Sequence, residues 1–292
     1  MKIQHKYALA GSLFVLPSFL YYLFVFLYPL ALCLFNSLNR VNLLMGTGTF
    51  IGLRNFTNLF ARADFLSSVK ITINYAVITL PVLLIVTIWI ANALAQIKGK
   101  FSNLLTTLVF LPFMVSMVSA GMVWDWLFDP NLGLINNVLR FLHISNPPAW
   151  LRATNTALVS TVIITVWIRS PFSIMILYGG IKNVPEDLYE AAELDGVDSF
   201  HRFFKITLPL INPQMILVLT LETIYVFKAF DQIYVATAGG PAGVTKTIMI
   251  YLIKDIFMQN YGMASSLTVL ILIVLFIISL TQQLILKRKI EY

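Results

Sequence analysis

The chain has 292 residues, of which 59% are hydrophobic and only 11% are charged, and its formal net charge is +7. A soluble globular domain contains about 25% charged residues, so this composition excludes one and indicates a polytopic membrane protein. Basic loops that orient membrane spans explain the positive charge better than nucleic-acid binding, because no long basic stripe is present. Cys33 is the single cysteine, which excludes a disulfide framework and a cysteine metal site.

Six nearly uncharged runs are each long enough to cross a hydrocarbon core, which needs about 20 helical residues. The first run is too long for a signal peptide and no small-residue cleavage site follows it, so we expect a retained span. The predicted fold class is therefore all-α, a polytopic membrane protein with six transmembrane helices at residues 8–35, 71–97, 104–128, 157–180, 210–236 and 262–286.

The runs divide the chain into three parts. Residues 1–70 hold the first span and an external segment, residues 71–286 form a core of five spans, and residues 287–292 are a basic tail. Lysine and arginine are about twice as dense in the short segments that are internal when both termini are cytoplasmic. We therefore expect both termini, and the segment 181–209, on the cytoplasmic side.

The segment 181–209 predicts a helical hairpin. From Asn183 it reads NVPEDLYEAAELDGVDSFHRFFKITLPL, with Pro185 suited to the first helical position. Gly196 ends the first helix, because glycine enters the left-handed conformation freely, and Asp198 caps the second. Each helix carries an apolar face with i, i+3, i+4 spacing: Leu188, Ala191 and Ala192 in the first, and Phe200, Phe203 and Phe204 in the second.

The hairpin has two possible surroundings, lipid headgroups or a protein partner. An acidic helix binds an anionic inner leaflet poorly, which favours a protein partner. The acids of the first helix are Glu186, Asp187, Glu190, Glu193 and Asp195.

This hairpin resembles the EAA loop of the membrane subunits of ATP-binding-cassette importers. The resemblance is carried by Glu190-Ala191-Ala192, by Gly196 six positions after the glutamate, and by Ile206, Leu208 and Pro209. It implies the type I ABC importer permease fold, with coupling helices that sit in a cleft of a cytoplasmic ATPase. The implied ATPase-coupling residues are Glu190, Ala191, Ala192, Asp195, Gly196, Phe200, Phe203, Phe204, Ile206, Leu208 and Pro209.

Residues 50–60, 111–139, 236–257 and 261–274 are similar to a narrower group, the first permease of carbohydrate importers of the maltose, glycerol-phosphate and multiple-sugar type. No loop here has room for the large extra domain of the maltose-type protein. The resemblance implies a sugar permease of the bacterial inner membrane, surrounded by lipid and paired with a second permease. It also implies two copies of an ABC ATPase, which bind ATP and Mg, and an extracytoplasmic solute-binding protein. No cofactor is expected in this chain, and no nucleic acid as a partner.

Two charges fall near the middle of predicted spans, where each costs about 2.5–3.5 kcal/mol. Arg169 and Glu222 lie at similar depth, so they either pair as a structural lock or line a wet cavity that receives cargo. The resemblance to the maltose-type permease implies that Arg169, Glu222, Tyr225, Thr165 and Phe172 contact sugar. These charges exceed those of a neutral-disaccharide site and favour an acidic oligosaccharide, although Glu222 argues against pure anion selectivity.

The remaining marked residues have structural interpretations. Lys228 and Asp231 have i, i+3 spacing and are expected to pair. Trp124, Asp125 and Trp126 are expected at the outer interface as anchors, and Gly262, Ala264, Ser265 and Ser266 indicate tight helix packing at the start of the last span.

Absent motifs narrow the function. No G-x-x-x-x-G-K-[ST] phosphate loop is present, so ATP hydrolysis by that route requires another subunit. No nucleophile elbow, His-Glu-x-x-His motif or clustered ligands are present, which argues against an enzyme or a metal site. The alternative function is a proton- or sodium-coupled secondary transporter, which would need inverted repeats and coupling-ion carboxylates. The sequence shows one deep carboxylate, Glu222, and no repeat between its halves.

Overall fold

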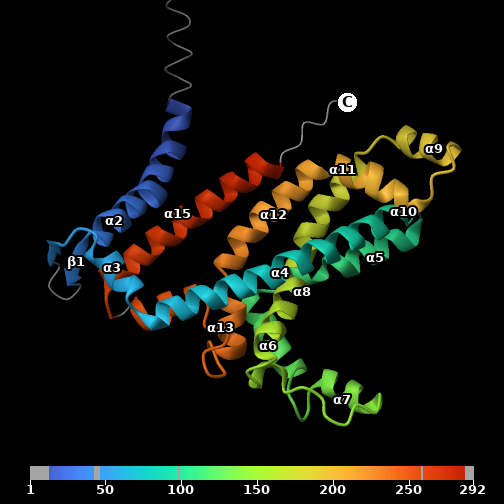
Figure 1. Ribbon diagram of the computed structural model, residues 1–292. Helices are drawn as coiled ribbons and strands as arrows, with labels where there is room; N and C mark the ends of the chain where they lie inside the picture. Colours follow the sequence, from blue (N-terminus) through green and yellow to red (C-terminus); the bar gives the residue numbers. More distant parts are fainter. Residues whose placement is uncertain (1–12, 43–46, 98, 258, 287–292) are drawn as a thin grey trace, which may run out of the picture. The chain divides into compact units, whose positions relative to one another are not determined.

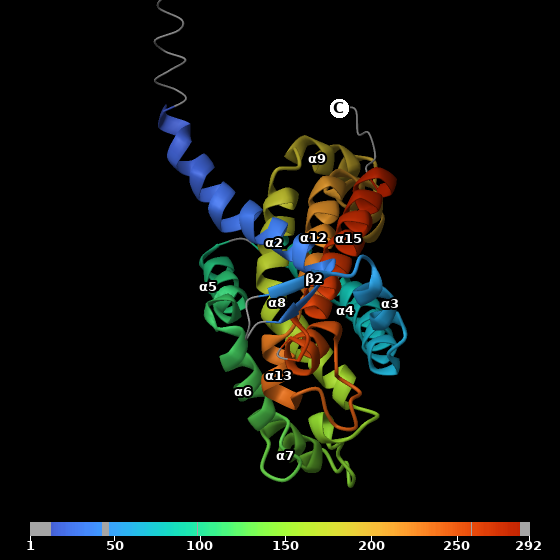
Figure 2. The ribbon, with the colours of Figure 1, turned by 90° about the vertical axis from the view of Figure 1, so that its left-hand side faces the viewer.

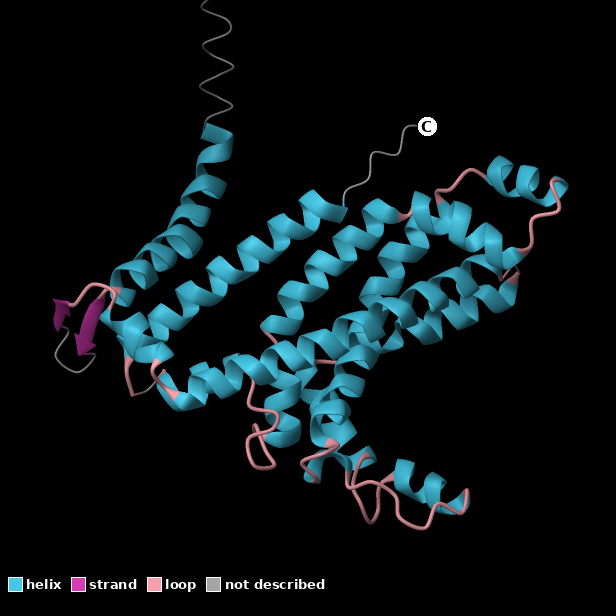
Figure 3. Ribbon diagram, in the orientation of Figure 1, coloured by secondary structure: helices cyan, strands magenta, loops and turns pink. Residues whose placement is uncertain are grey.

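The computed structural model describes residues 13–42, 47–97, 99–257 and 259–286, so the basic tail 287–292 and residues 8–12 of the first predicted span lie outside the described residues. The described chain is mostly helical (Figure 3), in agreement with the predicted all-α class. It divides into two compact units, Met1–Ala63 with Leu252–Ile273, and Asp64–Tyr251 with Val274–Tyr292. The long helix α15 (Tyr261–Leu286) passes from one unit into the other.

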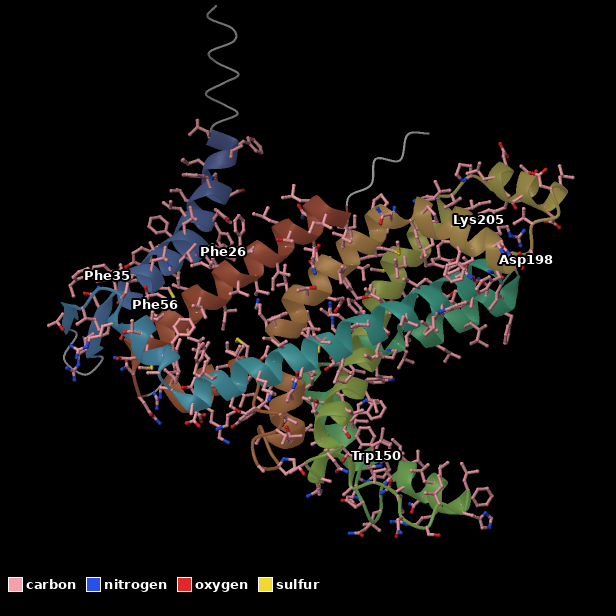
Figure 4. The ribbon with its side chains drawn as sticks, viewed as in Figure 1. Phe26, Phe35, Phe56, Trp150, Asp198 and Lys205 are labelled. Atoms are coloured by element: carbon pink, nitrogen blue, oxygen red, sulfur yellow. The ribbon has the colours of Figure 1, made fainter. Side chains whose placement is uncertain are left out.

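The first unit begins with an apolar helix, Leu13–Ser37, that is long enough to cross a membrane. It contains a π-helical turn, η1 (Leu23–Leu27), and ends as α2 (Tyr28–Ser37). Its large apolar side chains are exposed, including Phe26 and Phe35, which are labelled in Figure 4. Apolar side chains without cover in this chain fit a helix whose solvent is lipid.

A small two-stranded sheet follows the first helix, and this sheet was not predicted from the sequence. Strands β1 (Asn39–Asn42) and β2 (Thr47–Phe50) are antiparallel, with Asn39 opposite Phe50, and α3 (Arg54–Phe60) follows them. The buried Asn55 side chain donates hydrogen bonds to the carbonyls of Ser37 and Asn39, both at 2.9 Å. These bonds satisfy backbone carbonyls at and just after the end of α2, which have no partner within the helix. They thereby fix the strand pair β1–β2 against α3.

The first turn of α15 packs closely inside the same unit. A Cβ atom at Gly262 would meet the carbonyl oxygen of Asn39, so only glycine fits there without movement. The Ser266 hydroxyl donates to the carbonyl of Ser37 at 3.0 Å. The tight packing expected from small residues at the start of this span is confirmed.

The second unit holds the remaining long helices (Figure 1). In chain order they are α4 (Ala63–Gln96), α5 (Lys100–Phe110), η2 (Leu111–Met114), α6 (Met117–Leu127), α7 (Leu134–Phe141), η3 (Trp150–Arg152), α8 (Ala157–Lys182), α9 (Glu186–Leu194), α10 (Ser199–Arg202), η4 (Phe203–Thr207), α11 (Leu208–Leu210), α12 (Asn212–Phe227), α13 (Asp231–Thr237), α14 (Ile248–Ile250) and η5 (Tyr251–Ile256).

By length and apolar composition, four helices of the described chain are candidate spans, or up to six if each of two bent pairs is one span. The first bent pair consists of Phe101–Met114 and Met117–Leu127, and the chain bends by 103° between them. Val115 is extended between its halves, and the Ser116 hydroxyl accepts a hydrogen bond from the Ser119 amide to begin α6. The second pair, Ser199–Leu210 and Asn212–Phe227, meets at 69°.

Helix α8 is at the centre of the second unit. It contacts α12, with which it runs side by side (Figures 1 and 2), and it also contacts α5, α6 and α13. One buried cluster joins Tyr75 of α4, Val162 of α8, and Val226 and Ile233. A second cluster, which includes Ala91, Ile174, Leu177 and Val218, fills the space nearer the hairpin end of the same helices. These packed layers hold α8 and α12 in one rotational setting, which positions the charges that both helices carry.

Candidate functional site

The two charges predicted at mid-span depth contact each other. Arg169 on α8 donates from Nε to Glu222 Oε2 at 2.9 Å and from Nη2 to Oε1 at 2.8 Å. The Glu222 side chain is fully buried, whereas that of Arg169 retains 13% exposure. Of the alternatives left open by the sequence, direct pairing is therefore what the structure shows, in the bidentate geometry that makes such pairs strong.

A third donor completes the coordination of the Glu222 carboxylate. The Ser173 hydroxyl, one helical turn beyond Arg169, donates to Oε1 at 3.0 Å. Burial of a carboxylate is costly unless it is paired and hydrogen-bonded, and these three donors meet that requirement. Ser173 was not among the predicted site residues, although its spacing from Thr165 and Arg169, i+8 and i+4, places the three on one polar stripe of α8.

Aromatic rings flank the Arg169 guanidinium. Its Cζ atom lies 4.1 Å from the ring centroid of Tyr225 and 5.0 Å from that of Phe172. Phe172 stacks in turn on Phe113 at 6.3 Å, and the Tyr225 hydroxyl contacts the Met117 sulfur at 3.0 Å. Four of the five predicted cargo residues are therefore brought together: Arg169, Glu222, Tyr225 and Phe172.

The fifth, Thr165, belongs to a neighbouring buried network. Its hydroxyl is 2.5 Å from the Tyr75 hydroxyl and accepts from Gln232 Nε2 at 3.2 Å. All three side chains are buried, so Thr165 is occupied by partners within the chain. Tyr75 and Gln232 come from α4 and α13, and no local signal in the sequence connects them to this site.

The predicted hairpin forms, and Gly196 lies at its turn. Gly196 has φ +71°, the left-handed region that favours glycine, directly after α9. Asp198 caps α10 by accepting from the His201 amide. The hydrogen bond from the His201 imidazole also holds the pKa of the Asp198 carboxyl below its ordinary value.

The apolar faces predicted for the hairpin divide between the chain's interior and the exterior. Ala192 is buried, whereas Leu188, Ala191 and Leu194 on the same helix are exposed. In the second half, Phe203 is buried and stacks on Trp89 of α4 with ring centroids 5.3 Å apart. The other predicted ATPase-coupling residues are either exposed or half-buried. The exposed ones are Glu190, Asp195, Gly196, Phe200 and Phe204, and the half-buried ones are Ile206, Leu208 and Pro209.

The prediction of an ion pair between Lys228 and Asp231 is wrong. Helix α12 ends at Phe227 and α13 begins at Asp231, so the helical i, i+3 relation between the two residues does not exist. Among the described residues, the ion pairs within 4.0 Å include none between these side chains. The break also divides the predicted span 210–236.

The described residues contain no group of three or more His, Cys, Asp or Glu side chains able to hold a metal ion.

Comparisons with known proteins agree over most of the chain. Residues 71–292 match the family described as the binding-protein-dependent transport system inner membrane component. The chain is 32% identical over 270 residues to the trehalose/maltose transport system permease protein MalF of Thermococcus litoralis, covering 92% of this chain and 90% of that protein. It is 31% identical over 285 residues to the sn-glycerol-3-phosphate transport system permease protein UgpA of Yersinia pestis, covering 96% and 95%.

A solved structure shares the fold. The crystal structure of a bacterial ABC transporter involved in the import of the acidic polysaccharide alginate contains a chain that superposes with a TM-score of 0.84 at 21% identity. The superposition covers 99% of this chain and 98% of that one. The predicted type I ABC importer permease fold is thereby confirmed.

Proposed function

Because the chain belongs to the family of binding-protein-dependent transport system inner membrane components, we propose that it forms, with a second permease, the pathway of an ATP-driven sugar importer. The observation that carries this proposal is the exposed hairpin between α8 and α12, which bears the Glu190-Ala191-Ala192 and Gly196 elements. In the proposed assembly this hairpin sits in a cleft of an ABC ATPase and transmits its movement.

The proposed partners follow from the same resemblance. Two copies of a cytoplasmic ATPase bind ATP and Mg, so this chain carries no cofactor of its own. A solute-binding protein outside the membrane delivers the cargo. Both termini and the hairpin are cytoplasmic, an orientation supported by the higher density of basic residues in the segments on that side.

The cargo is a sugar or oligosaccharide that contacts Arg169, Tyr225 and Phe172, while the fully buried Glu222 holds the Arg169 guanidinium in place. Relatives are named for trehalose, maltose and sn-glycerol-3-phosphate, which supports a hydroxyl-rich cargo. Aromatic rings beside a charged pair suit such a molecule, because rings stack on the apolar faces of sugars while the charged groups bind hydroxyls. The Arg169 guanidinium has N–H groups beyond the two given to Glu222, and these also suit a carboxylated sugar.

Transport proceeds by alternating access. ATP binding closes the two ATPase subunits and draws the coupling hairpins together. The movement passes through α8 and α12 and opens the pathway toward the binding protein, which releases its cargo. ATP hydrolysis then returns the inward-facing state.

Purification and reconstitution test the assembly. The tagged chain, isolated from its own membranes, should bring down a second six-span protein and an ABC ATPase. Liposomes that hold this complex should import sugar only with ATP and the binding protein. Transport by the chain alone, driven by a proton or sodium gradient, would instead identify a secondary transporter.

The hairpin turn offers a test of coupling. Gly196→Val places a β-branched residue at φ +71°, a left-handed conformation that costs an L-residue about 1–2 kcal/mol. We expect several-fold more ATP hydrolysed per imported sugar, because the hairpin no longer holds its shape. Gly196→Asn is the matched control and should stay coupled, since asparagine tolerates this conformation. Equal coupling ratios for wild type, Gly196→Val and Gly196→Asn would contradict the linkage role.

A further inference from the structure

A cavity of about 520 Å³ lies between the hairpin and the ends of two membrane-length helices. We call it the hairpin cavity. Its size falls in the range of small-molecule sites, about 300–1,000 Å³. The lining residues come from the end of α4 (Asn92, Ala95, Gln96), the end of α8 and the link after it (Ile181, Lys182, Val184), α9 (Glu186, Tyr189), and α10 with η4 (Ser199, Arg202, Phe203, Thr207).

Two cations on different elements line the hairpin cavity. Lys182 Nζ donates to the carbonyl of Ala95 at 3.0 Å, and Arg202 Nη2 donates to the Ser199 hydroxyl at 3.2 Å. An ammonium has three N–H groups and a guanidinium five, so both retain donors for a ligand. Glu186 is the single acid of the lining, and Arg202 Nη1 also lies 3.7 Å from Oε2 of the exposed Glu193 outside the lining.

The other polar groups of the lining are neutral donors and acceptors. Asn92 and Gln96 enter from α4, and the Tyr189 and Thr207 hydroxyls lie 3.0 Å apart across the hairpin. The buried ring of Phe203 contributes an apolar wall. A few polar groups on an apolar frame are typical of sites that orient one small molecule.

The cavity lies on the side of α9 opposite the surface available to a partner. At 100° per residue, Glu186 and Tyr189 point to one side of α9, and the exposed Leu188, Ala191 and Leu194 point to the other. A ligand in the cavity therefore does not compete with a protein that covers the exposed face. It contacts both halves of the hairpin and can set their position against α4 and α8.

We propose that the hairpin cavity binds a phosphate-bearing anion, with its phosphoryl group between Lys182 and Arg202. Arginine and lysine are the residues that bind phosphate oxygens best, through charge-assisted hydrogen bonds. Helices α4 and α8 are both long and apolar enough to cross a membrane, and both end at the cavity, so a phospholipid headgroup is one source of such a phosphate. The phosphate therefore comes from a lipid headgroup or from a soluble phosphate ester, and the site exists whichever solute the chain transports.

Binding to the purified full-length chain tests the site without its partners. Wild-type protein in neutral detergent is titrated with phosphatidylglycerol, phosphatidylcholine or glycerol 3-phosphate, and thermal unfolding and native mass spectrometry report binding. We expect saturable binding of a phosphate-bearing ligand. Phosphatidylglycerol without glycerol 3-phosphate identifies a headgroup site, whereas glycerol 3-phosphate binding identifies a soluble ligand.

Charge-removing variants locate the binding. Arg202→Gln and Lys182→Gln should each weaken it about tenfold or more, because each removes a charge-assisted hydrogen bond. Lys205→Gln is the matched control, since Lys205 is exposed on the same hairpin, outside the lining (Figure 4). The use of two variants keeps the test decisive if one of them fails to fold. Absence of binding by wild type, or equal weakening by Lys205→Gln, would overturn the proposal.

Discussion

Replacement of Arg169 by methionine removes two of the three donors that Glu222 has in the structure. Only the Ser173 hydroxyl, 3.0 Å from Oε1, remains for a carboxylate with no exposed surface. Removal of one partner from a buried pair destabilises a protein by about 3–5 kcal/mol, because the other charge stays buried and unpaired. We expect Arg169→Met to lose stability by about this amount.

The double variant separates a structural role from a role in transport. Arg169→Met with Glu222→Leu removes both charges and leaves apolar groups of similar volume, which is often neutral or stabilising. We expect its stability to return to within about 1–2 kcal/mol of wild type. The losses of the two single variants should therefore not add, as is found for residues in direct contact. Sugar uptake should nevertheless stay lost, since the contacts proposed for the cargo are absent.

Two measurements are therefore compared for wild type, both single variants and the double variant. Unfolding of the purified protein reports the coupling energy, and uptake into proteoliposomes with ATP and binding protein reports function. Normal uptake by the stable double variant would refute the cargo role and leave the pair as a lock between α8 and α12. A single variant as stable as wild type would refute the burial argument itself.

Two further predictions concern neighbouring contacts. Ser173→Ala removes one hydrogen bond to a buried charge and should cost about 1.5–3 kcal/mol in unfolding free energy, whereas Ser170→Ala, whose hydroxyl bonds only its own helix, should cost less. Equal losses would show that Ser173 does not hold Glu222. Gly262→Ala should lower the melting temperature, because its Cβ meets the Asn39 carbonyl, and an unchanged melting temperature would contradict this close approach.

The sequence predicted that Arg169 and Glu222 lie at a similar depth, and it left open whether they contact each other. Depth follows from counting residues along spans of known length, about 1.5 Å per residue. Contact depends on how each helix is rotated. Apolar residues occur around the whole circumference of α8 and α12, so their hydrophobic pattern alone does not specify a rotation. The polar stripe of Thr165, Arg169 and Ser173 contains this information for α8 alone.

The break between α12 and α13 was not predictable from local signals. No proline or glycine occurs at residues 228–230, and apolar residues lie on both sides of this stretch. The chain leaves the helical region at Phe230, with φ −135°, and α13 packs on α6. Gly121 permits this approach, since a Cβ there would lie 3.1 Å from the Gln232 carbonyl oxygen. Tertiary packing therefore determines where α12 ends. The same break removes the helical spacing on which the predicted Lys228–Asp231 pair depended.

The Arg169–Glu222 pair and the hairpin are connected by the same two helices. Thirteen residues separate Arg169 from Lys182 at the end of α8, and ten separate Glu222 from Asn212 at the start of α12. At 1.5 Å per residue these lengths are about 20 Å and 15 Å, roughly half the thickness of a hydrocarbon core or more. Any displacement of the hairpin that slides α8 along α12 must therefore stretch the two bonds of the pair. Because these two hydrogen bonds are short, we expect the pair to oppose such sliding until its atoms move beyond hydrogen-bond distance, and to separate after that, as a two-state step requires.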